Sequence, residues 1–203
     1  REGGTIIDDL IAYKLSPEKA LICVNAANIE KDWNWIFQQA KPFNLELSNQ
    51  SKSYSLLAIQ GPNSAELLQK VGLISKEELN PDFFPYYSIK QIIKNNSPLI
   101  LARTGYTGED GFEVFSPSPE IAQTIWKEST LNGATPCGLA ARDVLRLEVC
   151  YPLYGHELSD EVTPLDSALK WTVKLDKDNF LGKSFLSSYK PKYRLIKLSL
   201  NKG

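Results

Sequence analysis

The sequence RTGYTGEDGFE, residues 103–113, contains three glycines and two aromatic residues and joins two predicted strands. Those strands, residues 98–103 and 111–116, follow from β-type residue patterns on either side. Glycines permit positive φ and close approach of a flat ligand, and aromatic rings offer faces for contact. No Gly-Lys-Ser/Thr sequence follows and no helix is predicted to start at the loop, which excludes a phosphate-binding loop.

Outward from this loop, strand and helix patterns are mixed without regular alternation. In chain order we predict strands over 5–15 and 20–24, a helix over 25–40, strands over 44–48 and 54–60, a helix over 65–71, strands over 87–94, 98–103 and 111–116, and helices over 119–131 and 138–149. This order favours an α+β fold, with mainly antiparallel sheets and packed helices, over a doubly wound parallel sheet.

The same pattern suggests three consecutive segments. Residues 1–70 are expected to form a ββαββα unit and residues 71–188 a second α+β unit. Residues 189–203 are expected to be a linker that leads into a further domain, with a strand over 195–200. The absence of any Met and the abrupt start at Arg1 suggest a piece of a longer chain.

Composition excludes several classes of function. The 203 residues are 42% hydrophobic, which is typical of soluble globular proteins, and contain no apolar run of membrane-spanning length. Lys plus Arg (23) nearly balance Asp plus Glu (24), so no basic field for nucleic acid or a membrane surface is expected. With three cysteines and one histidine, a disulfide framework, a zinc site or a Ser-His-Asp triad is hard to build. We expect chemistry that uses carboxylates, Arg, Tyr and Asn, without a metal.

Two acids, Asp8 and Asp9, stand inside the first apolar segment, GGTIIDDL at residues 3–10. Because side chains alternate across a strand, we expect Asp8 and Asp9 to point to opposite faces. One of them then lies on the core-facing side, where a carboxylate needs a partner or has a raised pKa, and is a candidate site residue.

Taken together, the motifs resemble the glycine cleavage system T-protein, an aminomethyltransferase. The matching stretches are GGTIIDDLI at 3–11, VNAANIEKD at 24–32, AIQGP at 58–62, RTGYTGEDGFE at 103–113, GLAARDVLRLE at 138–148, LYG at 153–155, and Thr163, Pro164 and Trp171. They run in this order over nearly the whole chain. The combination is specific, whereas a single glycine-rich loop would mean little.

The resemblance implies an enzyme that moves the one-carbon unit from the aminomethyl-lipoyl arm of H-protein to tetrahydrofolate, a co-substrate, with release of ammonia. It implies a three-domain fold with the folate at the domain junction, where residues 71–188 form part of the folate site. Carried over by motif, Asp9 is the catalytic acid, which stabilises positive charge near the reacting nitrogens. Asn25, Tyr106, Glu113 and Arg142 are the folate-binding residues, with Glu113 as the pterin anchor.

Other consequences of the resemblance concern the ends of the chain and its relatives. Family members have a segment before GGTIIDDL and a C-terminal barrel-like domain, so we expect the 203 residues alone to be inactive. The expected location is the cytoplasm, or the mitochondrial matrix in a eukaryote. The alternatives are a related folate-dependent demethylase and a non-catalytic folate-binding module, although the KGCYxGQE-type motif of the latter is absent from this sequence.

Overall fold

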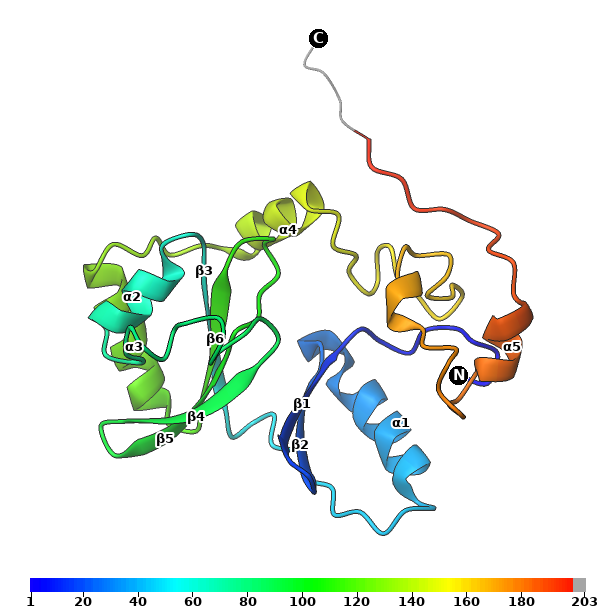
Figure 1. Cartoon of the computed structure of the whole chain (residues 1–203), viewed down its shortest axis with the longest axis horizontal. Coiled ribbons are helices and arrows are strands. Elements are labelled where there is room, and N and C mark those ends of the chain that lie inside the picture. The colour runs from blue at the N-terminus through cyan, green and yellow to red at the C-terminus, as the bar shows by residue number, and fades with distance from the viewer. Residues whose placement is uncertain (199–203) are drawn as a thin grey trace. The chain divides into compact units, whose positions relative to one another are not determined.

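The computed structural model describes residues 1–198 and combines helices with antiparallel sheets, as the α+β prediction requires (Figure 1). The strands are β1 (Ile11–Ser16), β2 (Lys19–Cys23), β3 (Ser55–Gln60), β4 (Ile89–Lys94), β5 (Ser97–Ala102) and β6 (Gly111–Ser116). The α-helices are α1 (Ile29–Ala40), α2 (Ser64–Lys70), α3 (Pro119–Leu131), α4 (Leu139–Glu148) and α5 (Lys183–Ser188), with short 3-10 turns at Ala26–Asn28 and Lys170–Thr172.

The chain folds as two compact units, each drawn from separate stretches of sequence. Unit 1 consists of Arg1–Ile11, Cys23–Asn44 and the chain from Cys150 onward, and unit 2 consists of Ala12–Ile22 and Leu45–Val149. These units are discontinuous in sequence, unlike the consecutive segments 1–70, 71–188 and 189–203 that the sequence suggests.

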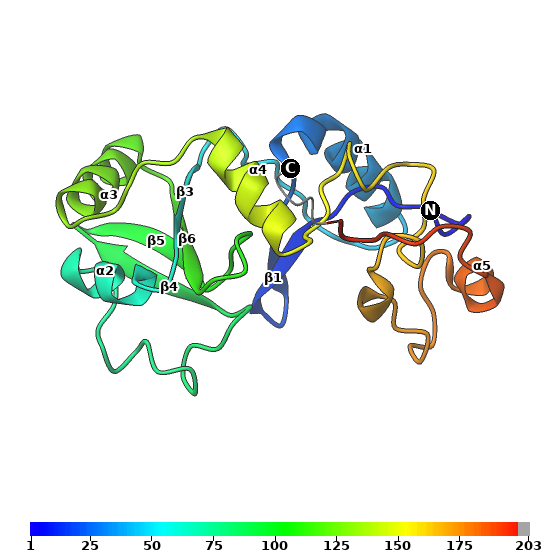
Figure 2. The same cartoon turned by 90° about the horizontal axis from the view of Figure 1, so that it is seen from above.

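Unit 2 is built on a four-stranded antiparallel sheet in the order β3-β6-β5-β4. Strand β6, one of its two interior strands, carries alternating apolar residues and is buried almost throughout, with Phe112 and Val114 fully inaccessible. Helices α2 and α3 lie beside the sheet (Figures 1 and 2), and their residues Leu68 and Ile125 are fully buried in the same core as Phe112. Burial of such side chains contributes roughly 1.5–3 kcal/mol each, so this core is the main source of stability in unit 2.

Local signals place α3 where the sequence predicts it, at Pro119–Leu131. The Ser118 hydroxyl accepts a hydrogen bond from the Ile121 amide at 3.3 Å, and Pro119 occupies the first turn, where its missing N–H costs nothing. The chain leaves the helix through Gly133, whose φ of +98° suits glycine.

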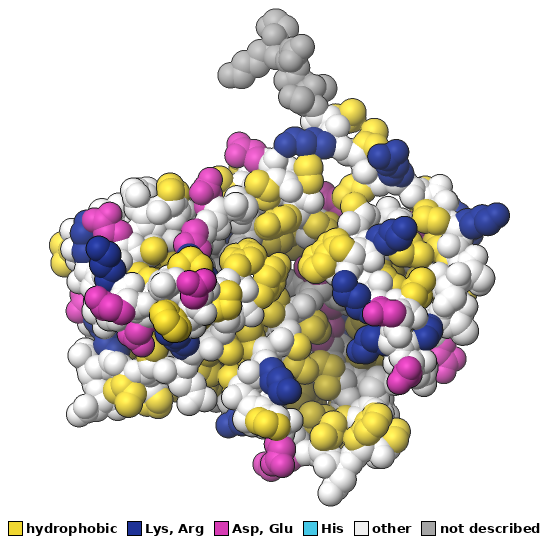
Figure 3. Space-filling view, viewed as in Figure 1, with side chains coloured by type: hydrophobic (Ala, Val, Ile, Leu, Met, Phe, Trp, Pro, Cys, Tyr) yellow, Lys and Arg dark blue, Asp and Glu magenta, His cyan; other side chains and the backbone are white. Residues whose placement is uncertain are grey.

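Helix α4 follows a different distribution of polarity. Arg146 is 2% exposed and pairs with Asp143 at 2.7 Å, whereas Leu139 is 77% and Val144 55% exposed. Hydrophobic side chains, yellow in Figure 3, reach the surface in several places, and the apolar residues of α4 are among those that do. An amphipathic pattern therefore identifies this helix correctly without predicting which of its residues are buried.

Three element predictions in residues 1–48 are wrong. Residues 5–10 are irregular, so the first strand begins at Ile11 and the two acids precede it. Residues 44–48 form no strand, which makes the expected ββαββα order ββαβα. The helix predicted from residue 25 begins as an α-helix only at Ile29, after a 3-10 turn.

The last part of the chain has little regular structure. Asp166, which is 5% exposed, anchors it by accepting hydrogen bonds from the Thr163 hydroxyl at 2.6 Å, the Tyr189 hydroxyl at 3.0 Å and the Lys192 amide at 2.9 Å. Of the strand predicted over 195–200, residues 195–198 are irregular and the remainder lie outside the described residues.

Residues 1–198 contain neither a candidate membrane span nor a candidate metal site. None of the helices there combines the length and apolar character needed to cross a membrane. Within the same described part, no three His, Cys, Asp or Glu side chains are grouped so that they could hold a metal ion.

Candidate functional site

The loop between β5 and β6 is fixed at its base by an ion pair. Arg103 donates to both carboxylate oxygens of Asp110, at 3.0 and 2.7 Å, and also to the backbone oxygens of Leu79 and Phe84, at 3.2 and 2.8 Å. Such a bidentate pair has one geometry and restrains both residues. It therefore joins the two ends of the loop and ties them to the segment that precedes β4.

Gln60 at the end of β3 supports the same loop from inside. Its amide nitrogen donates to the backbone oxygens of Thr104 (3.1 Å) and Phe112 (3.3 Å). A Cβ built on Gly105 or Gly111 would lie 1.8 or 2.0 Å from Gln60 Oε1. These two glycines make room for the Gln60 side chain, and the expectation that the loop admits a flat ligand stays a prediction.

Gly108 is the glycine of this loop that needs its conformational freedom. Its φ is +78°, and a Cβ there would lie 2.4 Å from Cγ1 of Val149, just after α4. The tip of the loop is thus pressed against the end of α4.

Glu113, the predicted pterin anchor, lies on β6 opposite Ala58 of β3 and Ala102 of β5. Its Oε2 accepts hydrogen bonds from the Thr104 hydroxyl and, at 3.2 Å, from the Tyr13 hydroxyl. Two alanines beside the carboxylate leave space around it, and two hydroxyls set its direction. Tyr13 and Thr104 were not predicted from the sequence, because a tyrosine in an apolar strand and a threonine in a loop carry no distinguishing signal.

Tyr106 and Arg142, both predicted site residues, contact each other. The guanidinium carbon of Arg142 lies 4.5 Å from the centre of the Tyr106 ring, a cation–π arrangement. Arg142 is exposed and Tyr106 half-buried, so the ring shields one face of the guanidinium and leaves its remaining donors accessible. Together with the contact between Gly108 and Val149, this pair fixes the loop to both ends of α4.

Glu113, Tyr106 and Arg142 line one cavity of about 880 Å³ in unit 2. The volume lies within the range of small-molecule sites, and both polar and apolar residues line the cavity. Its apolar lining includes Leu57, Ile59, Leu67, Trp126, Leu139 and Leu145. Three of the five predicted residues therefore share one cavity with a carboxylate acceptor, a guanidinium donor and an aromatic ring.

The other two predicted residues, Asp9 and Asn25, lie together in unit 1. The Asn25 amide nitrogen donates to Asp9 Oδ1 at 3.1 Å, to the Asp9 backbone oxygen at 3.0 Å and to Asp8 Oδ1 at 3.0 Å. The two acids thus converge on one amide, and the prediction that they point to opposite faces is wrong. The segment is irregular, so the alternation of a strand does not apply to it.

The electrostatics of this group are unfavourable to negative charge. Burial raises the pKa of Asp9, and the negative charge of Asp8 raises it further. Hydrogen bonds from Asn25 and from the Tyr154 backbone amide act in the opposite direction without cancelling the rise. A carboxylate held in this way gains most when a positive charge arrives beside it.

Lys31 is the nearby cation in unit 1, and its contacts hold it in place. Its ammonium group donates to the Ile7 backbone oxygen at 2.6 Å and lies 3.5 Å from the centre of the Tyr154 ring. Tyr154 donates its hydroxyl hydrogen to Asp160. Lys31 is half-buried beside the acids.

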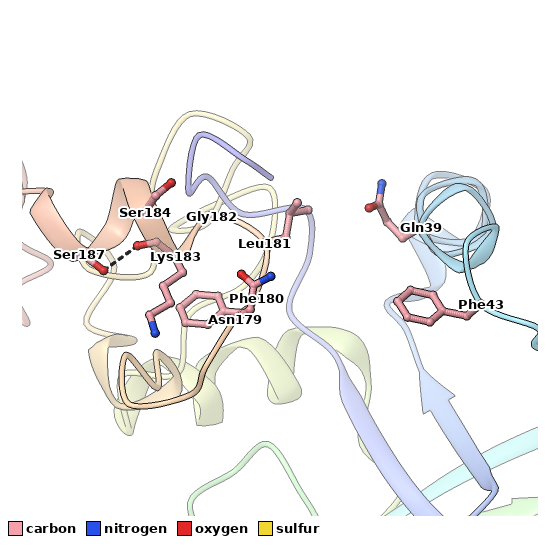
Figure 4. Close-up of a pocket in the computed structure, with 9 residues that line it drawn as sticks. All are labelled: Gln39, Phe43, Asn179, Phe180, Leu181, Gly182, Lys183, Ser184 and Ser187. Carbon is pink, nitrogen blue, oxygen red and sulfur yellow. Dashed lines mark hydrogen bonds between the residues drawn. The ribbon is translucent and has the colours of Figure 1, made fainter.

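A second cavity, of about 710 Å³, lies in unit 1 but contains none of the predicted residues. Figure 4 shows Gln39 and Phe43, at and beyond the end of α1, facing the segment that leads into α5. The dashed line there is the bond from the Ser187 hydroxyl to the Lys183 backbone oxygen at 2.8 Å, and the Lys183 ammonium group donates to the Lys177 backbone oxygen. The charged group of Lys183 is thus already engaged in a hydrogen bond. We do not assign this cavity to the candidate site.

Comparison with known proteins gives consistent results. Residues 1–177 match the protein family described as the GCVT N-terminal domain. The chain is 46% identical over 205 residues to the aminomethyltransferase of Thermotoga sp. (strain RQ2), which covers 98% of this chain and 55% of that protein. It is 46% identical over 192 residues to the aminomethyltransferase of Caldanaerobacter subterraneus subsp. tengcongensis, covering 92% of this chain and 50% of that protein.

The fold agrees with these matches. The crystal structure of glycine cleavage system aminomethyltransferase T from Bartonella henselae superimposes with a TM-score of 0.76 at 32% sequence identity, covering 92% of this chain and 50% of that one. The chain therefore spans about half the length of the relatives that it matches.

Proposed function

Because the chain belongs to the GCVT N-terminal domain family, we propose that it carries the folate-binding and charge-stabilising residues of an aminomethyltransferase of the glycine cleavage system. The proposed reaction moves the one-carbon unit from the aminomethyl-lipoyl arm of H-protein to tetrahydrofolate and releases ammonia. Tetrahydrofolate supplies the nitrogens that accept this unit.

The observation that carries the proposal is the cavity that contains Glu113, Tyr106 and Arg142. A pterin presents a ring N–H and an exocyclic amino group side by side, and a carboxylate accepts from both. Tyr13 and Thr104 hold Glu113 in one direction for this contact. Arg142 supplies donors for the acceptor atoms of the ring, and Tyr106 supplies an aromatic surface.

We assign Asp9 the electrostatic role in the reaction. It is a half-buried carboxylate whose charge is opposed by burial and by Asp8, so positive charge that develops during the reaction relieves both costs. Asn25 fixes the direction of Asp9 by donating to its side chain and its backbone oxygen.

Replacing Glu113 by Gln tests the cavity assignment. The amide offers one acceptor and one donor group where the pterin needs two acceptors, so we expect tetrahydrofolate affinity to fall by about tenfold to a hundredfold, or roughly 1–3 kcal/mol. Calorimetry on the chain and on the full-length gene product measures this loss. Glu109→Gln is the matched control, because Glu109 is an exposed acid of the same loop that does not line the cavity. Unchanged affinity in Glu113→Gln removes Glu113 from the site.

Activity is tested separately in the full-length gene product. We expect ammonia release that requires both aminomethyl-loaded H-protein and tetrahydrofolate. Folate binding without such release, with intact H-protein and a positive control enzyme, identifies a non-catalytic folate-binding module instead. Release of a methyl group from an N-methylated donor, without any need for H-protein, identifies a demethylase.

A further inference from the structure

A carboxyl group on α1 is buried in unit 1 without a hydrogen-bond donor. Asp32 is 1% exposed, and neither of its oxygens accepts a hydrogen bond from the described residues. Oδ2 of Asp8 is also buried and also accepts no hydrogen bond from the described residues. Since an ionised carboxylate only accepts hydrogen bonds, two of them cannot satisfy each other, and burial of unpaired charge is costly.

The charged groups around Asp32 favour its neutral form. Asp8 and Asp9 face it from the N-terminal segment, and Lys31 neighbours it on α1. The Lys31 ammonium group is already engaged by the Ile7 oxygen and the Tyr154 ring. Burial is the largest cause that raises the pKa of Asp32, to about 7; hydrogen bonding to Asp8 and the charges of Asp8 and Asp9 add to it, and Lys31 opposes it.

We propose that the carboxyl group of Asp32 is protonated and donates a hydrogen bond to Oδ2 of Asp8. Asp32 is then a positioning residue for Asp8, Asn25 and Asp9. The shared proton gives both orphaned carboxyl groups a partner. The functional part of this inference rests on the proposed role of Asp9. The shared proton itself does not depend on that role.

The positioning follows from a continuous series of hydrogen bonds. Once Oδ2 of Asp8 accepts from Asp32, Oδ1 of Asp8 remains for the Asn25 amide, at 3.0 Å. The same nitrogen donates to Asp9 Oδ1 at 3.1 Å. Loss of the proton places a third negative charge beside Asp8 and Asp9, which repels Asp8 and releases Asn25.

Nuclear magnetic resonance of the carboxyl carbons tests the proton directly in the chain and in the full-length gene product. We expect Asp32 to titrate near neutral pH and the side-chain amide signals of Asn25 to shift with the same midpoint. In Asp32→Asn the shift of the Asn25 signals over this range should disappear. If Asp32 titrates as an ordinary aspartate, or Asn25 does not follow it, the inference is overturned.

Stability against pH gives a second readout. The folded chain retains a proton on Asp32 that the unfolded chain loses above about pH 4, so stability should fall as pH rises from about 4 to 7. Asp32→Asn keeps a donor toward Asp8 without a titration and should flatten this slope. Glu30→Gln, an exposed acid on the same helix, should leave the slope unchanged. An unchanged slope in Asp32→Asn contradicts the shared proton.

Turnover tests the functional part in the full-length gene product. Asp32→Leu keeps the branched shape of the side chain but has no hydrogen-bond donor, and should lower kcat by about tenfold to a hundredfold with little change in the folate KM. Asp32→Asn should restore most of this loss and remove its dependence on pH near neutrality. Equal losses in both variants overturn the positioning role. If the wild-type protein has no folate-dependent turnover while Asn25 still follows Asp32, the proposed function fails and the shared proton stands.

Discussion

The two groups of candidate site residues are held by opposite kinds of interaction. In unit 2, Glu113 lies on a regular sheet, and two hydroxyl donors fix the direction of its carboxylate. The ion pair of Arg103 with Asp110 holds the neighbouring loop. Around Asp9 in unit 1, an irregular segment gathers acids on one amide, and burial opposes their charge. Unit 2 therefore gains stability from its site, whereas unit 1 gives up stability to hold a negative potential.

The largest expected effect tests the cost in unit 1. Asp9→Asn preserves the shape of the side chain and removes the negative charge that is proposed to stabilise positive charge during the reaction. Turnover of the full-length gene product should therefore fall by about two to three orders of magnitude. The same change should raise the stability of the chain at neutral pH. Because the pKa of Asp9 is raised on folding, the destabilisation that Asn removes grows as pH rises through the titration of Asp9.

Asp8→Asn sharpens this result, because Asn25 joins both acids. We expect it to lower turnover by about tenfold, less than Asp9→Asn but more than a residue on an opposite face would. Steady-state kinetics and thermal unfolding of both variants, measured side by side, separate the two roles. A drop in both activity and stability in Asp9→Asn would remove the contrast between the units.

The next effect tests the stabilising character of unit 2. Gly105→Ala places a Cβ against the Gln60 carboxamide and should displace both of its hydrogen bonds, at a cost of roughly 2–3 kcal/mol. Gly3→Ala is the control, since no atom lies within 4 Å of its Cβ, and should change stability by less than about 0.5 kcal/mol. Chemical denaturation of the chain measures both values, and equal values would show that Gln60 moves aside freely.

The smallest effect concerns Arg142. Removal of an exposed cation over the Tyr106 ring should cost about 0.5–1 kcal/mol of stability in Arg142→Ala. If Arg142 contacts the ligand as proposed, the free energy of folate binding should fall by more than this loss of stability. Arg142→Lys separates the two contributions, because it retains the charge and loses the planar set of donors. A loss of stability without a loss of affinity would leave Arg142 as a packing residue.

Sequence reasoning succeeded where hydrogen-bonded periodicity or a local cap determines the structure. Strand β6 and helix α3 begin and end at the predicted residues, because apolar alternation fixes the first and Ser118-Pro119 the start of the second. The segment at 44–48 has the same alternation, yet Leu45 is 62% exposed and the segment forms no strand. Alternation predicts a strand only when a partner edge is present, and the sequence of one segment does not contain that information.

The candidate site divides in the same way. Tyr106, Glu113 and Arg142 meet at one cavity because a hairpin and a neighbouring helix position them. The roles of Tyr13, Thr104 and Asp32 arise from contacts between residues far apart in the sequence or from burial, and no pattern announces either. The prediction that Asp8 and Asp9 point to opposite faces is wrong for a related reason, because residues 5–10 are irregular and have no strand periodicity.

The side chain of Gln60 and the two glycines beside it share one small volume, which links position 60 to positions 105 and 111 of a distant loop. A larger residue at 105 or 111 collides with the Gln60 side chain unless position 60 has first become smaller. A smaller residue at 60, while both glycines remain, leaves a cavity and removes the two hydrogen bonds that Gln60 donates. Substitutions at these positions should therefore be strongly epistatic. In a protein that already carries Gln60→Ala, we expect Gly105→Ala to cost much less stability than it does in the wild-type protein. The order in which substitutions arise in this loop is therefore more restricted than the choice of residue at any one of its positions.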